Sequence, residues 1–99
     1  MSDLLPVDEC LQALGDPTRR RVVELLATGA RRAGELAVLV KVRPAAMSRH
    51  LRILLAAGLV DDERSVTDAR VRLFFLCREP LAGVEKWLGD VLGGAKPAR

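Results

Sequence analysis

Residues 43–60 read RPAAMSRHLRILLAAGLV, and this stretch decides the fold. Pro44 can open a helix, because its missing N–H falls at the first helical position, where that group has no intrahelical acceptor. Gly58 can end the helix, since glycine adopts the left-handed cap conformation freely. Between them, basic residues lie near the start and leucines fill the second half. A small helix with a basic start, placed behind a short turn, is typical of proteins that enter the DNA major groove.

The segment before this helix predicts another short helix and a tight turn. Residues 34–40 read GELAVLV and offer apolar residues at helical spacing. Residues 41–43 then form the turn that leads into the helix beginning at Pro44. Two short helices joined by a tight turn, the second basic at its start, fit a helix-turn-helix.

Two further helices are expected upstream. Residues 7–14 place apolar side chains on one face, and Gly15 interrupts them. Asp16 and Pro17 form a strong helix start, with Asp as the N-cap and Pro at the first helical position. The helix that follows is expected to run to about Thr28.

After Gly58 the pattern changes to that of a β-hairpin. One strand begins at Leu59, residues 67–69 give a turn signal, and residues 71–76 (VRLFFL) are rich in strand formers. Such a hairpin beside a helix-turn-helix is a wing. It is either a plain two-stranded cover for the core or a pair of basic fingers on the DNA backbone or minor groove. The arginines near its tip are Arg64, Arg70 and Arg72.

A closing helix is expected from Pro80 to Leu92, with a wide apolar stripe and Trp87 beside it. Together with the first helix it offers more apolar surface than one small domain can bury, which favours a homodimer. The expected interface residues are Leu11, Leu14, Leu81, Val84, Trp87, Leu88 and Val91.

The bulk composition indicates one folded, cytoplasmic domain spanning residues 1–99, with 93–99 as a loose tail. Apolar residues make up 49% of the 99-residue chain, and two cysteines do not form a disulfide framework. We expect neither a signal peptide nor a membrane span. The net charge is only +3, but residues 31–52 hold six basic residues against one acid. That excess is either a solvated face or a nucleic-acid footprint.

The order and spacing of these segments resemble the ArsR/SmtB family of bacterial winged-helix repressors, over roughly residues 10–92. The resemblance implies a mainly α winged helix-turn-helix fold, with about five helices and two strands. It also implies dimerisation through the first and last helices, a negative effect on transcription, and release from DNA when an effector binds. The segments that carry it are LGDPTRRRVVELL (14–26), GELA (34–37), MSRHLRILLAAGLV (47–60), RVRLFFL (70–76) and EPLAGVEKWL (79–88).

The resemblance places Ser48, Arg49 and His50 on the family's recognition-helix motif. Ser48 is expected to face base edges or phosphate, and Arg49 is the better candidate for guanine or phosphate. His50 is the only histidine. It is either a phosphate or packing residue, or a metal ligand or catalytic base, and a lone histidine supports the second role poorly. The expected DNA contacts are Arg32, Lys41, Arg43, Ser48, Arg49, His50, Arg52, Arg64, Arg70 and Arg72.

The chain departs from the family at the start of the recognition helix, where Arg43 replaces a Ser or Thr N-cap. Ala45 and Ala46 cannot hydrogen-bond to bases, so phosphate contacts and DNA shape are expected to carry more of the affinity. Arg32 similarly lies at a helix start, just before the segment GELA (34–37). Both arginines lie unfavourably near a positive helix end, and a DNA phosphate would relieve this conflict.

The family's metal sites lack their ligands in this chain. Residues 37–39 are Ala, Val and Leu where thiols would lie, and the last helix holds Glu85 and Asp90 but no histidine. We therefore expect no metal and no cofactor. Cys10 and Cys77 are by default small buried hydrophobes, and the alternative is a redox, persulfide or soft-metal switch.

Three functions compete. The leading one is a dimeric, sequence-specific repressor of a pseudo-palindromic DNA operator in a bacterial or archaeal cytoplasm, with an unknown effector. The second is a winged-helix module that docks other proteins, against which the basic segment 31–52 and the wing arginines argue. The third, an enzyme, is rejected because the sequence has no carboxylate pair, phosphate loop or nucleophile with a histidine partner.

Overall fold

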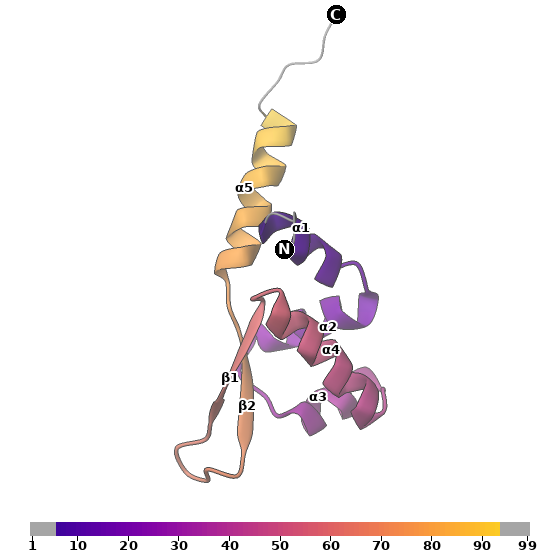
Figure 1. Ribbon diagram of the computed structural model, residues 1–99, viewed down its shortest axis with the longest axis vertical. Coiled ribbons are helices and arrows are strands. Elements are labelled where there is room, and N and C mark those ends of the chain that lie inside the picture. The colour runs from indigo at the N-terminus through magenta and orange to yellow at the C-terminus, as the bar shows by residue number, and fades with distance from the viewer. Residues whose placement is uncertain (1–5, 94–99) are drawn as a thin grey trace, which may run out of the picture.

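The structure is a computed structural model that describes residues 6–93. This part of the chain forms five helices and one antiparallel hairpin, which confirms the expected fold class (Figure 1). In chain order the elements are α1 (Pro6–Ala13), α2 (Pro17–Leu26), α3 (Ala33–Val40), α4 (Pro44–Ala56), β1 (Val60–Arg64), β2 (Arg72–Leu76) and α5 (Glu79–Gly93). Residues 94–99, most of the expected tail, lie outside the described part.

Asp16 starts α2 as expected. Its Oδ1 atom accepts hydrogen bonds from the backbone N–H groups of Thr18 and Arg19, at 2.7 and 3.1 Å. The far end of α2 differs from the expectation, because the helix stops at Leu26. There the N–H of Thr28 turns back to the carbonyl of Leu25, three residues earlier, and such a bond tightens and terminates the last turn.

Gly58 ends α4 in the way the sequence predicts. Its φ is +74°, in the left-handed region, and its N–H donates to the carbonyl of Leu55. The N–H of Leu59 reaches back to the carbonyl of Leu54, which completes a Schellman motif. This tight end sends the chain directly into β1.

Lys41 ends α3 with the same backbone geometry but without glycine. Its φ is +61°, and it is the one non-glycine residue with a positive φ between residues 6 and 93. Its N–H donates to the carbonyl of Val38, and the N–H of Val42 reaches the carbonyl of Ala37. This turn sets α3 and α4 at their mutual angle in the helix-turn-helix.

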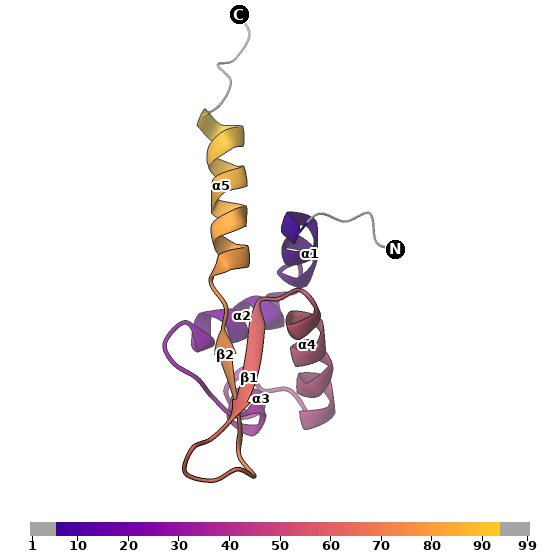
Figure 2. The same cartoon turned by 60° about the vertical axis from the view of Figure 1, so that its left-hand side comes forward.

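The core lies between the helix-turn-helix, α2 and the base of the hairpin (Figure 2), and α1 and α5 add Cys10, Ala13 and Val84 to it. All three buried residues of α4 recur at helical spacing and point into it, which leaves the opposite arc of this helix free. The largest fully buried side chains are Leu36, Met47, Leu54, Leu59, Val22 and Cys10. Helix α5 extends away from this body, with α1 packed against it.

The hairpin is fastened to the body at Phe74. Its N–H donates to the carbonyl of Arg31 at 2.8 Å, and its carbonyl accepts from the N–H of Arg31 at 3.0 Å. Phe74 itself is buried in the core. The base of the wing is therefore tied to the loop that precedes α3 by backbone hydrogen bonds.

Candidate nucleic-acid interface

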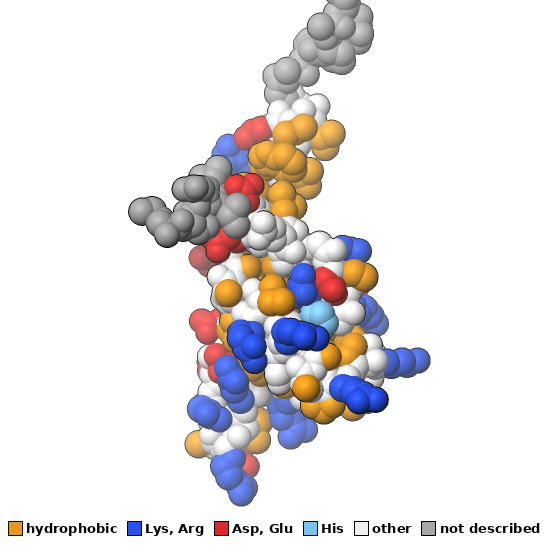
Figure 3. Space-filling view, turned by 45° about the vertical axis from the view of Figure 1, so that its right-hand side comes forward, with side chains coloured by type: hydrophobic (Ala, Val, Ile, Leu, Met, Phe, Trp, Pro, Cys, Tyr) orange, Lys and Arg blue, Asp and Glu red, His pale blue; other side chains and the backbone are white. Residues whose placement is uncertain are grey.

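The free arc of α4 carries the polar and basic residues of the recognition helix. Ser48, Arg49 and Arg52 are exposed, while Met47 and Leu51 on the other side are buried. Figure 3 shows Lys and Arg side chains gathered over the body of the domain, on the face that also carries the histidine. The expected basic surface is thus present, with α4 at its centre.

A groove of about 400 Å³ separates α4 from the wing. Ser48 and Arg52 line it from α4, and Arg72 and Phe74 line it from β2. The fold therefore brings together three of the expected DNA-contact residues, which are far apart in the sequence.

Arg72 is already paired within the wing. Its guanidinium forms an ion pair with Asp62 on the neighbouring strand and lies 4.7 Å from the ring centroid of Phe74. The hydrogen bond from Arg72 lowers the pKa of Asp62. Sequence reasoning missed Asp62, whose proximity to Arg72 depends on the strand register, in which Asp62 faces Phe74.

Arg70 is also paired. Its Nε and Nη2 atoms lie 3.1 and 3.2 Å from the two carboxylate oxygens of Asp68, and these bonds lower the pKa of Asp68. Arg64 is exposed and forms no ion pair with any residue of the described range 6–93. Of the three wing arginines, Arg64 is thus the one without an ion pair in the described part of the chain.

The two arginines at helix starts differ. Arg32 precedes α3, where Glu35 accepts the backbone N–H of Arg32 at 3.0 Å and lies 3.7 Å from its Nε. The backbone bond from Arg32 lowers the pKa of Glu35. Glu35 therefore compensates the positive helix end, which the sequence reading of Arg32 had missed. Arg43 precedes α4, is exposed, and makes no side-chain cap.

His50 is held by Arg19, a residue that sequence reasoning did not single out. The Nη1 atom of Arg19 lies 3.2 Å from Nδ1 of His50. A guanidinium can only donate, so Nδ1 of His50 is the acceptor in this hydrogen bond. The Nε atom of Arg19 donates to the carbonyl of Ala13 at 2.7 Å. This network connects His50 of α4 to Arg19 of α2 and, through Arg19, to the carbonyl of Ala13.

The expected dimer residues divide into two groups. Val84 is 9% exposed and belongs to the core of the protomer, against which Leu14 and Leu81 also pack. The other residues remain at the surface, and Figure 3 shows hydrophobic side chains along α5. The exposed apolar residues of α1 and α5 are Leu11, Trp87, Leu88, Val91 and Leu92.

Both thiols are free and shielded. Cys10 is fully buried and Cys77 is partly buried. Burial raises the pKa of Cys10, and burial together with Asp61 and Glu79 raises that of Cys77. Neutral thiols are weak nucleophiles and poor metal ligands. Across residues 6–93 no cluster of three or more His, Cys, Asp or Glu side chains could hold a metal ion, and no helix could cross a membrane.

This fold, with its basic helix α4 beside a hairpin, defines a winged helix-turn-helix protein. The sequence pattern of the arsR family of bacterial regulatory proteins matches residues 16–62. Residues 16–62 thus carry the ArsR-family pattern, which confirms the resemblance expected from the sequence.

Individual relatives agree with this assignment. The chain is 45% identical over 67 residues to the HTH-type transcriptional regulator Rv2034 of Mycobacterium tuberculosis, covering 68% of this chain and 63% of the relative. It is 34% identical over 58 residues to the transcriptional repressor SdpR of Bacillus subtilis, covering 59% and 64%. The chain thus spans somewhat less than two thirds of these relatives.

Solved structures extend the likeness to nearly the whole chain. The crystal structure of an ArsR family transcriptional regulator superposes with a TM-score of 0.79 at 29% identity, covering 93% of this chain and all of the other. The likeness therefore includes the wing and the closing helix, beyond the segment that the family pattern matches.

Proposed function

We propose that this chain is a homodimeric transcriptional repressor that binds a pseudo-palindromic operator in double-stranded DNA of the bacterial cytoplasm. The observation that carries the proposal is the exposed arc of α4. There Ser48, Arg49 and Arg52 stand free beside the groove that the wing closes. A helix of this kind fits the major groove.

The proposed DNA contacts are of two kinds, those to bases and those to phosphates. Arg49 can bind guanine through two hydrogen bonds, Ser48 can meet a base edge, and Arg52 lies one turn further along. Lys41, Arg43 and Arg64 are suited to phosphates, which set position and affinity but not sequence. The first turn of α4 adds only apolar contacts, such as that of Ala45 with a thymine methyl group.

The second protomer is expected to pack on the exposed apolar side chains of α1 and α5. An uncovered apolar stripe of this kind marks an interaction surface, and a two-fold symmetric pair would place two copies of α4 about one helical turn of DNA apart, roughly 34 Å. Trp87 and Leu88 lie on this stripe. We further propose that an effector, or oxidation of Cys10 and Cys77, releases the dimer from DNA. The raised pKa values of both thiols make oxidation the weaker of these two routes.

The test is a salt titration of DNA binding. Duplexes are selected from random DNA, and the affinity of the best one is measured over a range of salt concentrations. We expect the logarithm of the affinity to fall steeply and linearly with the logarithm of salt concentration, because each neutralised phosphate releases about one counterion. The selected duplex must also bind more tightly than an unrelated one. Weak binding with no sequence preference would favour the protein-docking module instead.

A further inference from the structure

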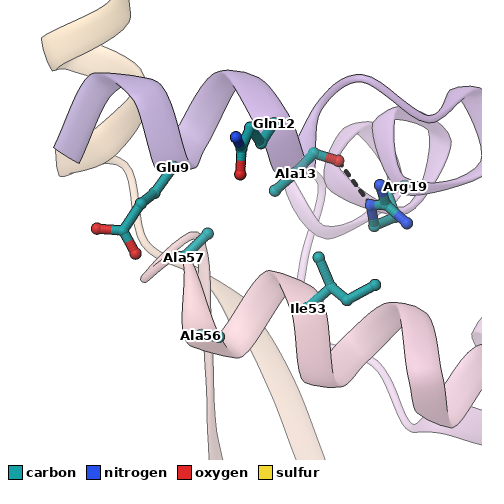
Figure 4. A pocket seen from close by; sticks show the side chains of 7 residues that line it. All are labelled: Glu9, Gln12, Ala13, Arg19, Ile53, Ala56 and Ala57. Carbon is teal, nitrogen blue, oxygen red and sulfur yellow. Dashed lines mark hydrogen bonds between the residues drawn. The ribbon is translucent and has the colours of Figure 1, made fainter. Parts of the chain in front are cut away.

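A hollow of about 320 Å³ lies between α1 and α4, away from Ser48 and Arg49. Glu9, Gln12 and Ala13 line it from α1, Arg19 from α2, and Ile53 and Ala56 from α4. Figure 4 shows Glu9 and Arg19 toward opposite ends, with the small alanines between the two helices. This volume is within the range that small ligands occupy in proteins.

Arg19 is a partly buried cation with no anion within hydrogen-bond distance in the described residues 6–93. Its side chain is 15% exposed, and its Nη1 atom lies 4.0 Å from the Asp16 carboxylate, beyond hydrogen-bond distance. The Asp16 oxygen that is engaged accepts the N–H groups at the start of α2. A guanidinium that is partly shielded from water gains from a close anion, and its planar fork matches a carboxylate.

We propose that this hollow is an effector site, which binds a small carboxylate through Arg19. Glu9 and Gln12 line the same hollow, so the opposite end of the ligand is expected to carry a hydrogen-bond donor such as an ammonium group. The ligand class is therefore a short amino acid or a similar acid with a distal donor. The regulatory consequence rests on the proposed function, because it names the signal that releases the repressor.

The same guanidinium connects the hollow to the recognition helix. Nη1 of Arg19 donates to Nδ1 of His50, which directly follows Arg49 in α4. A carboxylate that takes this donor leaves His50 without its partner and loosens the hold of α2 on α4. Bound ligand then lowers the affinity of the protein for DNA. Because the two binding equilibria are linked, bound DNA lowers the affinity for the ligand by the same factor.

The first experiment measures the affinity of the wild-type protein for its selected duplex. The probes are 4-aminobutyrate and butyrate, with potassium chloride at matched ionic strength as the control. We expect about a fivefold or larger loss of DNA affinity with 4-aminobutyrate, a smaller loss with butyrate, and none beyond the salt effect with chloride. A DNA affinity unchanged by both carboxylates overturns the proposal.

Three variants localise the response. Arg19→Gln should abolish it, whereas Arg20→Gln should retain it; Arg20 donates to the carbonyl of Leu14 at 2.7 Å from an exposed position outside the hollow. Ala56→Leu should fill the hollow without touching the bond between Arg19 and His50. It is therefore expected to bind DNA normally and to ignore the probes. A normal response in Ala56→Leu places the ligand elsewhere and overturns the proposal.

Nuclear magnetic resonance separates this inference from the proposed function. His50 is the only histidine, so its ring signals can be assigned without ambiguity. In the absence of DNA, 4-aminobutyrate should shift these signals in the wild type and not in Ala56→Leu. If no duplex binds at low salt, the repressor proposal fails, yet these shifts still decide whether the hollow is a ligand site. Unshifted signals in the wild type overturn it.

Discussion

Asp62 and Arg72 form an ion pair across the two strands of the wing, on the face that carries Phe74. The arginine lines the groove beside the recognition helix, but its charge is shared with a carboxylate of the same hairpin. In the proposed complex, DNA would have to compete with Asp62 for Arg72. The affinity contributed by the wing would then depend on this acid as much as on the arginine.

Asp62→Asn should strengthen DNA binding. The substitution releases Arg72 for a phosphate, so we expect a several-fold gain in affinity and a salt dependence steeper by about one unit. Glu63→Gln is the matched control, because Glu63 is an exposed acid of the same strand that forms no ion pair among residues 6–93. Equal gains in both variants would show that only the net charge matters.

Arg43→Ser should have opposite effects on stability and on binding. Serine can cap α4 where Arg43 makes no side-chain cap, so the free protein should gain about 1 kcal/mol of unfolding free energy. The loss of a cation at the start of the helix should weaken DNA binding severalfold. Denaturant unfolding and DNA titration measure the two effects. Stronger DNA binding at unchanged salt would contradict the role given to Arg43.

Asp16→Ala should cost about 1 kcal/mol of stability, because two N–H groups at the start of α2 lose their acceptor. Asp16→Asn should retain most of the cap. The bonds from Arg19 and Thr18 lower the pKa of Asp16 in the folded state. The stability that the charged Asp16 carboxylate contributes is therefore fully present above the pKa of the unfolded chain, about 3.9. It is lost as the pH falls through the lower pKa of the folded protein.

The measurement for Asp16 is unfolding by denaturant over a range of acidic pH. The stability difference between the wild type and Asp16→Ala should shrink toward low pH, since the wild type loses its charged cap there. The difference between Asp16→Asn and Asp16→Ala carries no charge and should stay nearly constant. A gap between wild type and Asp16→Ala that does not shrink in acid would contradict this account.

Val91→Glu should turn the dimer into a monomer. Val91 is 57% exposed on the apolar stripe of α5, and a charge buried between two copies of that stripe would be unpaired. Val66→Glu makes the same change at a fully exposed position of the wing and should leave the oligomeric state unaltered. Sedimentation velocity distinguishes the two species. A monomeric wild type would contradict the proposed dimer.

Local signals in the sequence predict most of the fold. Asp16, Pro44 and Gly58 each act within a few residues of their own position, so they mark helix ends before any tertiary contact is known. The partners of the charged side chains could not be predicted in this way. The pair Asp62 with Arg72 depends on strand register, and Arg19 meets His50 only once α2 and α4 have packed.

The backbone bridge between Arg31 and Phe74 holds the base of the wing against the loop that precedes α3. The base of the wing cannot pivot without breaking two hydrogen bonds and moving a buried aromatic ring. Any adjustment to the width of a DNA groove must therefore occur beyond the paired strands, in residues 65–71. In the proposed DNA complex, a longer or shorter tip in an otherwise similar chain would change which groove geometry is accepted and leave the placement of α4 unchanged.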